Sequence, residues 1–318
     1  MTINSEDHVQ QISMSEGERK ARKYSPQTLI QALSAMNHDG LVVLKNVIPV
    51  EIIDKINAKM CDDADRMLAD PSQVYNHGIK SNFLQRPPTS DAEYLDTSIY
   101  FNPFLLQLAN AYLGPRPVWN WCTANTALAN TTGMRQPAHK DSGFEHPLFP
   151  YMFIANIPLC DFSVENGATE FWLGTNALTT HRDQQVASDG TDLRPYPYAR
   201  MGDVIPPITE EAKQQRMTIR RPIQPECCRG DIMIRDLRTW HAGMPNSSHA
   251  HRVMLALGYM SPYYPSYKMS VHLPSSQREF FLGNANDMVN VRAQWYSEDE
   301  LVKTTADTEF YTRPVYLE

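Results

Sequence analysis

The sequence lacks a hydrophobic run long enough to cross a membrane, although the chain has 318 residues. Apolar stretches such as residues 253–260 are far shorter than the roughly 18 residues that a spanning helix needs. The first residues, MTINSEDHVQQ, contain no apolar signal core. We therefore expect a protein without a membrane span and predict a cytoplasmic location.

Cysteine and surplus positive charge are also scarce. The five cysteines include no C-x-x-C pair, which argues against a disulfide framework and against a structural zinc site. The chain carries 29 Lys and Arg against 36 Asp and Glu, so its net charge is −7. It has no electrostatic reason to bind nucleic acid or anionic lipid, and we expect a small-molecule partner. A homodimer stays open as an oligomeric state.

The composition is that of a globular protein, with 42% hydrophobic and 20% charged residues. Residues 1–24 are polar and lack apolar periodicity, so we expect a disordered tail there. The Ser-Pro pair at 25–26 predicts a helix start, residues 41–44 form an apolar β-branched run, and the stretch after Pro49 predicts a second helix. The remaining chain, residues 25–318, shows no composition break and is predicted to be a single domain.

From residue 118 onward, short alternating apolar segments are separated by Pro, Gly and Asn, which is typical of a β-sandwich or barrel. The expected strands lie near residues 118–129, 151–159, 168–173, 217–223, 231–236 and 252–260. A long polar stretch at 176–224 interrupts them and is predicted to be an insertion or lid. The fold class expected is therefore mainly β with flanking helices.

His139 and Asp141 are candidates for a metal site, because side chains two apart on an extended segment point to the same side. A facial triad of two histidines and one carboxylate leaves three positions open on Fe(II), and His241, just beyond a predicted strand, is the candidate third ligand. The H-x-D pattern alone is weak. With 10 histidines and 36 acidic residues, about one H-x-[DE] is expected by chance, and a second copy stands at 181–183 in the polar insertion.

Arg252 strengthens the first H-x-D motif. It lies 11 residues after His241 and begins the apolar segment RVMLALGYM. A fixed guanidinium can clamp a carboxylate through two parallel hydrogen bonds. An arginine beside a metal pocket therefore suits a dicarboxylate cosubstrate that chelates iron at its other end.

Four blocks of the sequence, in the right order, resemble the phytanoyl-CoA dioxygenase family of Fe(II)- and 2-oxoglutarate-dependent oxygenases. They are Q-P-x-H-x-D at 136–141, E-N-G-A-T-E-F-W-L-G-T at 165–175, R-G-D-I-M-I-R-D at 229–236, and W-H-A-G followed by Asn and Arg at 240–252. The opening segment with DGLVVLKNVIP is also similar to the family's N-terminal part. The resemblance implies a double-stranded β-helix, the jelly-roll or cupin-like fold, and the use of Fe(II), 2-oxoglutarate and O2.

The resemblance also implies roles for individual residues. His139, Asp141 and His241 would be the catalytic iron ligands, and Arg252 would bind the distal carboxylate of 2-oxoglutarate.

Three further positions are implied by the same resemblance to bind the cosubstrate. Gln136 resembles the family's polar residue lining the metal pocket, while Asn156 and Thr169 fall where family members point side chains toward the cosubstrate. Two residues depart from the family pattern: Asn176 stands where many members have histidine, and Gly243 where some have serine.

The implied reaction is the oxidation of an unactivated C–H bond of a small organic molecule, by hydroxylation, desaturation or rearrangement. A coenzyme A thioester would need a basic phosphate-binding patch, which this acidic chain lacks beyond Arg220 and Arg221, so an intermediate of specialised metabolism is favoured. An acyl-CoA or acyl-chain hydroxylase is an alternative. The same ligands also suit a zinc-dependent hydrolase or isomerase, and a non-catalytic jelly-roll accessory protein could retain the pocket.

Overall fold

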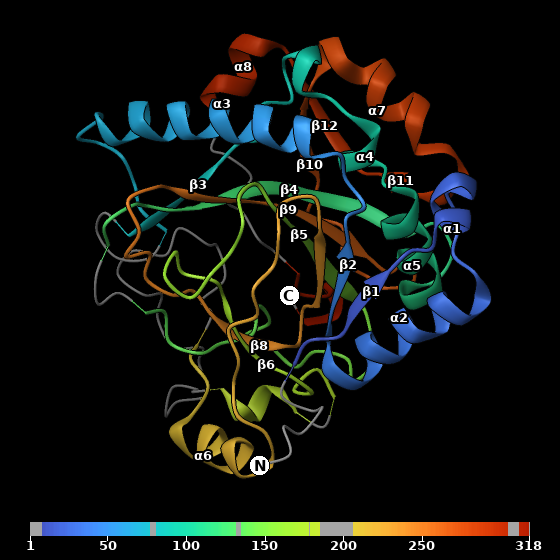
Figure 1. Ribbon diagram of the computed structural model, residues 1–318, viewed down its shortest axis with the longest axis vertical. Coiled ribbons are helices and arrows are strands. Elements are labelled where there is room, and N and C mark those ends of the chain that lie inside the picture. Colours follow the sequence, from blue (N-terminus) through green and yellow to red (C-terminus); the bar gives the residue numbers. More distant parts are fainter. Residues whose placement is uncertain are drawn as a thin grey trace.

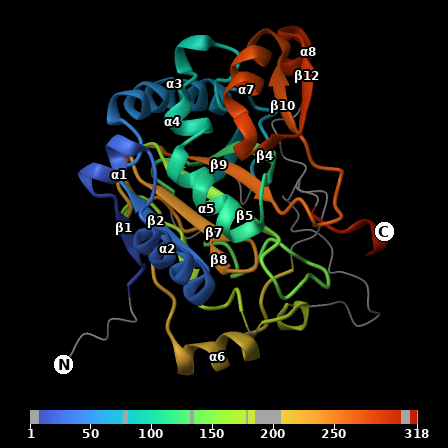
Figure 2. The same ribbon diagram turned by 90° about the vertical axis from the view of Figure 1, so that its right-hand side faces the viewer.

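A large mixed β-sheet forms the centre of the protein, and most of its helices lie along one side of that sheet (Figures 1 and 2). The computed structural model describes residues 8–76, 81–131, 135–177, 179–184, 206–304 and 312–317. The central sheet contains, in spatial order, β1 (Gln11–Ser13), β2 (Leu41–Lys45), β7 (Ile232–Asp236), β5 (Met152–Pro158), β9 (Arg252–Met260), β4 (Val118–Ala127) and β11 (Asn290–Val291), with β3 (Asn82–Gln85) also paired to β4.

Two smaller sheets accompany the central one in the described residues. The first pairs β6 (Glu170–Trp172) with β8 (Trp240–Ala242) in antiparallel orientation, and it lies on the opposite side of the central sheet from α3 (Val50–Leu68), as Figure 1 shows. The second pairs β10 (Val271–Pro274) with β12 (Ala293–Tyr296) in parallel orientation. In the central sheet, β1 and β11 are the parallel edge strands, and the ladders between them are antiparallel.

The helices follow local capping signals. In α2 (Pro26–Asp39) the Ser25 hydroxyl accepts a hydrogen bond from the Thr28 N–H, and Gly40 ends the helix with a φ of +69°. The predicted helices at the start of the chain are therefore confirmed by α2 and α3. The others are α1 (Glu16–Ala21), α4 (Thr97–Tyr100), α5 (Pro103–Leu113), α6 (Glu210–Ile219), α7 (Arg278–Ala285) and α8 (Glu298–Lys303).

The alternation of side chains along the central strands divides the sheet into two faces with different roles. On β9, Val253, Leu255 and Leu257 are fully buried in the main hydrophobic core, which α2, α3, α5 and α7 complete. Arg252 and Met254, which alternate with these residues along β9, line a cleft on the other face. Because successive residues of a strand point to opposite faces, one strand supplies both the core and the wall of a site.

The expected fold class, mainly β with flanking helices, is confirmed. The predicted strands near 118–129, 151–159, 168–173, 231–236 and 252–260 correspond to β4, β5, β6, β7 and β9. The strand predicted at 217–223 is wrong, because α6 extends to Ile219 and only Ile223 forms a β-bridge, to Phe171. Thr209 caps α6 by accepting from the Ala212 N–H, and two glutamates follow in the first turn, which favours a helix.

The disordered tail predicted for residues 1–24 is wrong over residues 8–24. β1 pairs with β2, and Ser15 and Glu18 form a reciprocal capping box at the start of α1. Ile12 and Met14 are buried in the main core. Isolated apolar residues in a polar segment are held by pairing to a sheet edge, which periodicity does not reveal. Residues 1–7 lie outside the described part of the chain.

The stretch 176–224, predicted to be an insertion or lid, is only partly described, since residue 178 and residues 185–205 lie outside. Its described ends meet at the β-bridge between Gln184 and Ile208. The Ile208 N–H donates to the Ala138 carbonyl at 2.7 Å, which attaches the stretch beside the H-x-D motif. Among the described residues, no helix is both long and apolar enough to cross a membrane.

Candidate active site

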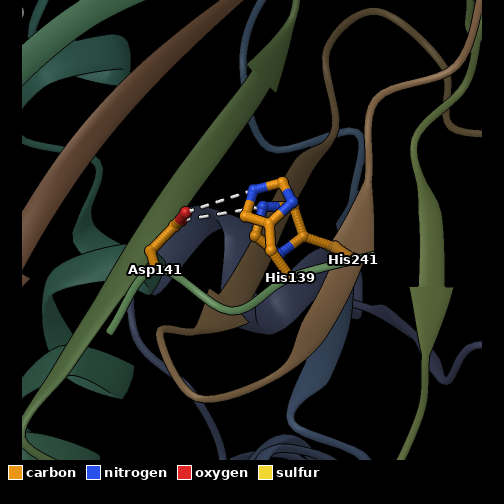
Figure 3. A group of neighbouring side chains, drawn as sticks. All are labelled: His139, Asp141 and His241. Carbon is orange, nitrogen blue, oxygen red and sulfur yellow. Dashed lines mark ion pairs between the residues drawn. The ribbon is translucent and has the colours of Figure 1, made fainter. Parts of the chain in front are cut away.

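Backbone pairing brings the two histidines of the predicted triad together, although they are about 100 positions apart in the sequence. The N–H of His139 donates to the His241 carbonyl at 2.9 Å, and the N–H of His241 donates to the His139 carbonyl at 2.8 Å. β8 carries His241, so this bridge places the H-x-D segment at the edge of the small sheet. Figure 3 shows both imidazoles and the Asp141 carboxylate pointing toward one another.

The three side chains form a compact donor set. One potential ligand atom from each of His139, Asp141 and His241 lies within 4.8 Å of the others. The Asp141 Oδ1 atom is 3.5 Å from His139 Nε2, and Asp141 Oδ2 is 3.7 Å from His241 Nε2. These separations allow one ion to contact all three groups, with two neutral imidazoles and a single carboxylate as ligands.

The second nitrogen of each imidazole fixes its orientation. His139 Nδ1 lies 2.9 Å from the Pro137 carbonyl oxygen, and His241 Nδ1 lies 3.2 Å from the Thr239 carbonyl oxygen. A carbonyl accepts only, so His139 Nδ1 donates to Pro137 when it carries the proton, and His139 Nε2 is then free to face Asp141 as a metal ligand. His241 Nδ1 lies between two groups, the Thr239 carbonyl and Arg235 Nη1 at 3.4 Å, and its Nε2 atom faces Asp141.

Arg235 on β7 holds the carboxylate in place. Its Nη2 atom donates to Asp141 Oδ2 at 2.6 Å, and both side chains are buried. Burial alone would raise the pKa of Asp141, but the positive charge of Arg235 outweighs burial and holds that pKa well below its ordinary value. Burial, together with the Arg235 charge, lowers the pKa of His241 well below its ordinary value. Asp141 is therefore ionised and His241 neutral at pH 7, as metal binding needs.

Arg252 is a buried cation that forms no ion pair with any described residue. Only 3% of the residue is exposed, and its Nε and Nη1 atoms have no hydrogen-bond partner among the described residues. Its guanidinium lies over the Phe162 ring at 5.0 Å from the ring centroid. Burial lowers the pKa of Arg252 to about 10, so it remains charged at neutral pH. An unpaired buried charge is costly, and a carboxylate ligand would satisfy it.

The structure brings all seven residues singled out from the sequence to one cleft. The triad and Arg252 line it together with Gln136, Asn156 and Thr169. Gln136 is fixed by a hydrogen bond to its Oε1 atom from the Gly243 N–H at 2.8 Å.

In the second H-x-D motif, at 181–183, the described side chains of Arg182 and Asp183 do not line this cleft. Its Asp183 carboxylate instead accepts a hydrogen bond from the Thr180 N–H at 2.6 Å, within a 3-10 turn.

Arg235 is a charged residue of the site that sequence reasoning missed. A signal exists in the segment IMIRD, where a single arginine interrupts an apolar strand. All five residues of β7 are buried, and a buried arginine is rare unless it has a partner. That partner, Asp141, is 94 positions earlier in the sequence and is revealed only by the fold.

A comparison with known families matches residues 36–254 to the model described as phytanoyl-CoA dioxygenase (PhyH). The chain belongs to the phytanoyl-CoA dioxygenase family. The resemblance inferred from the four sequence blocks is thereby confirmed. The iron/alpha-ketoglutarate-dependent dioxygenase penM of Penicillium thymicola is similar to this chain and is 27% identical to it over 169 residues. That alignment covers 43% of this chain and 48% of penM, about half of the relative's length.

Solved structures resemble this family member in fold. The epimerase SnoN, in complex with Fe3+, alpha ketoglutarate and nogalamycin RO, is 17% identical, with a TM-score of 0.51 over 74% of this chain and 85% of SnoN. AviO1 from Streptomyces viridochromogenes Tue57 is 15% identical, with a TM-score of 0.52 over 76% of this chain and 99% of AviO1. The predicted jelly-roll fold is confirmed, although the described strands form an open central sheet and two small sheets rather than a closed barrel.

Proposed function

We propose that this protein is an Fe(II)- and 2-oxoglutarate-dependent dioxygenase that oxidises an unactivated C–H bond of a small organic molecule. The observation that carries the proposal is a two-histidine, one-carboxylate cluster sharing a cleft with an unpaired, buried arginine. A metal site alone is compatible with many reactions. A metal site beside a cation that needs a carboxylate fits a chelating dicarboxylate cosubstrate.

In this proposal His139, Asp141 and His241 would hold the iron. When bound, the iron would use O2 to convert 2-oxoglutarate to succinate and CO2, and it would thereby supply an oxidant strong enough to attack a C–H bond. The protein binds, orients and excludes water. Arg252 holds the distal carboxylate of 2-oxoglutarate in a buried environment, where each hydrogen bond is stronger than in water.

The proposed substrates are intermediates of specialised metabolism, and hydroxylation, desaturation and rearrangement are all within the chemistry of such a site. Two relatives support substrates of this class. PenM is an iron/alpha-ketoglutarate-dependent dioxygenase, and SnoN is an epimerase whose crystal structure contains nogalamycin RO. An acyl-CoA hydroxylase is less well supported, because its phosphates would need a cluster of basic side chains. Apart from the histidines, the charged groups that line the cleft in the described residues are Asp141, Arg235 and Arg252. We also propose a cytoplasmic location and a single domain, extended to residue 8 by β1 and α1.

The test is an anaerobic titration of the purified protein with Fe(II) and 2-oxoglutarate, following the visible metal-to-ligand charge-transfer band. We expect a band in the intact protein and none in His241→Ala. In Arg252→Ala the band should need at least about tenfold more 2-oxoglutarate, because a charge-assisted carboxylate pair is lost. Arg66→Ala is the matched control, since Arg66 is an exposed arginine on α3.

Absence of the band in the intact protein would contradict the proposal and favour the zinc hydrolase, the zinc isomerase or the accessory protein. A zinc enzyme would turn over substrate without 2-oxoglutarate and O2. An unchanged 2-oxoglutarate requirement in Arg252→Ala would remove the role given to Arg252 while leaving the metal site in place.

A further inference from the structure

The cleft has a charged end and a neutral wall. Arg235, Asp141 and Arg252 gather near the proposed metal and cosubstrate positions. The neutral wall is supplied by β3 and β4, whose cleft-lining side chains are asparagine, threonine, leucine and tryptophan: Asn82, Leu84, Trp121, Thr123 and Asn125. The two halves of the cleft therefore suit groups of different charge.

No cation that lines the cleft in the described residues is left over for a charged substrate. Arg235 is paired with Asp141, and under the proposed function Arg252 binds the cosubstrate. A substrate carboxylate or phosphate in the neutral wall would be desolvated without a partner, which is strongly unfavourable. The described residues of this half of the cleft therefore favour a neutral part of the substrate.

Asn82 brings a buried acceptor atom to the wall. The residue is 8% exposed, and its Oδ1 atom has no hydrogen-bond partner among the described residues. In the sheet, Asn82 lies opposite Ala127, and Ala127 lies opposite Arg252. Two strand spacings place the Asn82 backbone about 10 Å from that of Arg252, on the same face.

The Asn82 Oδ1 atom is a buried acceptor on a strand that finds no donor among the described residues. Asparagine is depleted in β-strands, and an unmade hydrogen bond at a buried group costs free energy. Asn125 adds a second amide on the same face, because it lies opposite Leu84, two positions along β3 from Asn82. The side chains of Leu84 and Trp121 supply apolar surface around these amides. Two amides in an apolar wall indicate recognition of a specific neutral polar group.

We propose that Asn82 and Asn125 form the substrate-recognition wall, and that the wall takes a neutral molecule with an apolar body and one amide or hydroxyl group hydrogen-bonded to Asn82. An amide or hydroxyl group both donates and accepts, so it pairs with either end of the asparagine side chain. The inference rests on the proposed function, because it assigns the charged half of the cleft to iron and 2-oxoglutarate. Asn82 is thus a specificity-determining residue.

The experiment uses the whole protein loaded anaerobically with Fe(II) and 2-oxoglutarate, with loading verified by the charge-transfer band. Ligand-observed NMR gives dissociation constants for two matched pairs of probes, acetanilide with N-methylacetanilide and benzyl alcohol with benzyl methyl ether, and for phenylacetate. We expect acetanilide and benzyl alcohol to bind about fivefold more tightly than their methylated partners, the effect of one hydrogen bond. Phenylacetate should bind most weakly.

The variants Asn82→Leu and Asn82→Ser should reduce this discrimination to near unity while keeping the charge-transfer band. The serine variant tests the same position if leucine disturbs β3. Asn37→Leu, at an exposed asparagine of α2, is the matched control and should keep the fivefold preference.

Three results would overturn the proposal of a substrate-recognition wall. They are equal binding within both pairs in the intact protein, discrimination that survives in both Asn82 variants, and tight binding of phenylacetate with no binding of the neutral probes. A loaded protein that binds none of the probes would also overturn it, with the iron and 2-oxoglutarate assignment intact. Absence of the charge-transfer band would instead be a failure of the proposed function itself.

Discussion

Replacing Arg235 with methionine is the most informative perturbation of the metal-free protein, because this arginine is the partner that keeps a buried carboxylate ionised. Arg235 and Asp141 are 2.6 Å apart, with side chains 5% and 9% exposed. Methionine keeps most of the length of arginine and removes its charge. The variant therefore leaves Asp141 without its closest cation in a site that water barely reaches.

The magnitude follows from the burial of the pair. Removing one partner of a buried ion pair costs about 3–5 kcal/mol, because the remaining charge is desolvated and uncompensated. We expect Arg235→Met to lose about 3 kcal/mol of unfolding free energy, and Asp141→Asn to lose a comparable amount because it leaves Arg235 unpaired. Replacing both partners removes both charges. The double variant should therefore lose about 2–3 kcal/mol less than the sum of the single variants.

Urea unfolding in the presence of a metal chelator measures all four corners of this double-mutant cycle. Arg66→Met is the control, because Arg66 pairs with Asp63 on the exposed side of α3 and its loss should barely change stability. Additive losses in the double variant would refute the coupling between Arg235 and Asp141. So would an Arg235→Met loss as small as that of Arg66→Met.

Three further outcomes can be measured. Ile12→Ala should cost about 2 kcal/mol in urea unfolding, because Ile12 is buried in the core from β1; no effect would mean that β1 is not part of the folded domain. Hydrogen bonds from Thr28 and two serines hold the pKa of Glu18 well below its ordinary value, so Glu18→Gln should cost about 1 kcal/mol at pH 7. That gap should narrow as the pH falls below the unfolded-state pKa, and a constant gap would contradict the assignment. In Gly243→Ala the new Cβ would lie 2.7 Å from Gln136 Oε1, so the Gln136 side chain must move. Because Gln136 lines the cleft in which 2-oxoglutarate is proposed to bind, the 2-oxoglutarate dissociation constant should rise about tenfold.

The parts of the fold that could be predicted are those whose signal is local. The Ser25 cap with proline behind it marks α2, and the apolar runs of β2 and β9 are unambiguous. The triad could also be proposed, because the H-x-D motif and the later histidine and arginine stand in blocks that resemble one family. Charge, hydrophobicity and motif spacing are properties of the chain itself, so they are available before folding is known.

The parts that could not be predicted depend on partners distant in sequence. β1 has three residues, and only its pairing with β2 makes a strand of them. Apolar residues in the segment 217–223 predict a strand, whereas the cap at Thr209 and the glutamates after it favour a helix. β8 is equally short and exists because it pairs with β6 and with the H-x-D segment.

The two buried arginines of the cleft show why the site needed the structure. Arg235 and Arg252 both begin or interrupt apolar strands, and each is nearly inaccessible to water. Sequence alone singled out Arg252 and passed over Arg235. The structure separates their roles by one property, since Arg235 already has a carboxylate partner in Asp141 and Arg252 has none among the described residues. Arg235, which is paired with Asp141, stabilises that carboxylate and fixes its orientation. Arg252 has no such anion among the described residues, so a ligand has to supply one. For this reason the proposed function assigns the cosubstrate carboxylate to Arg252.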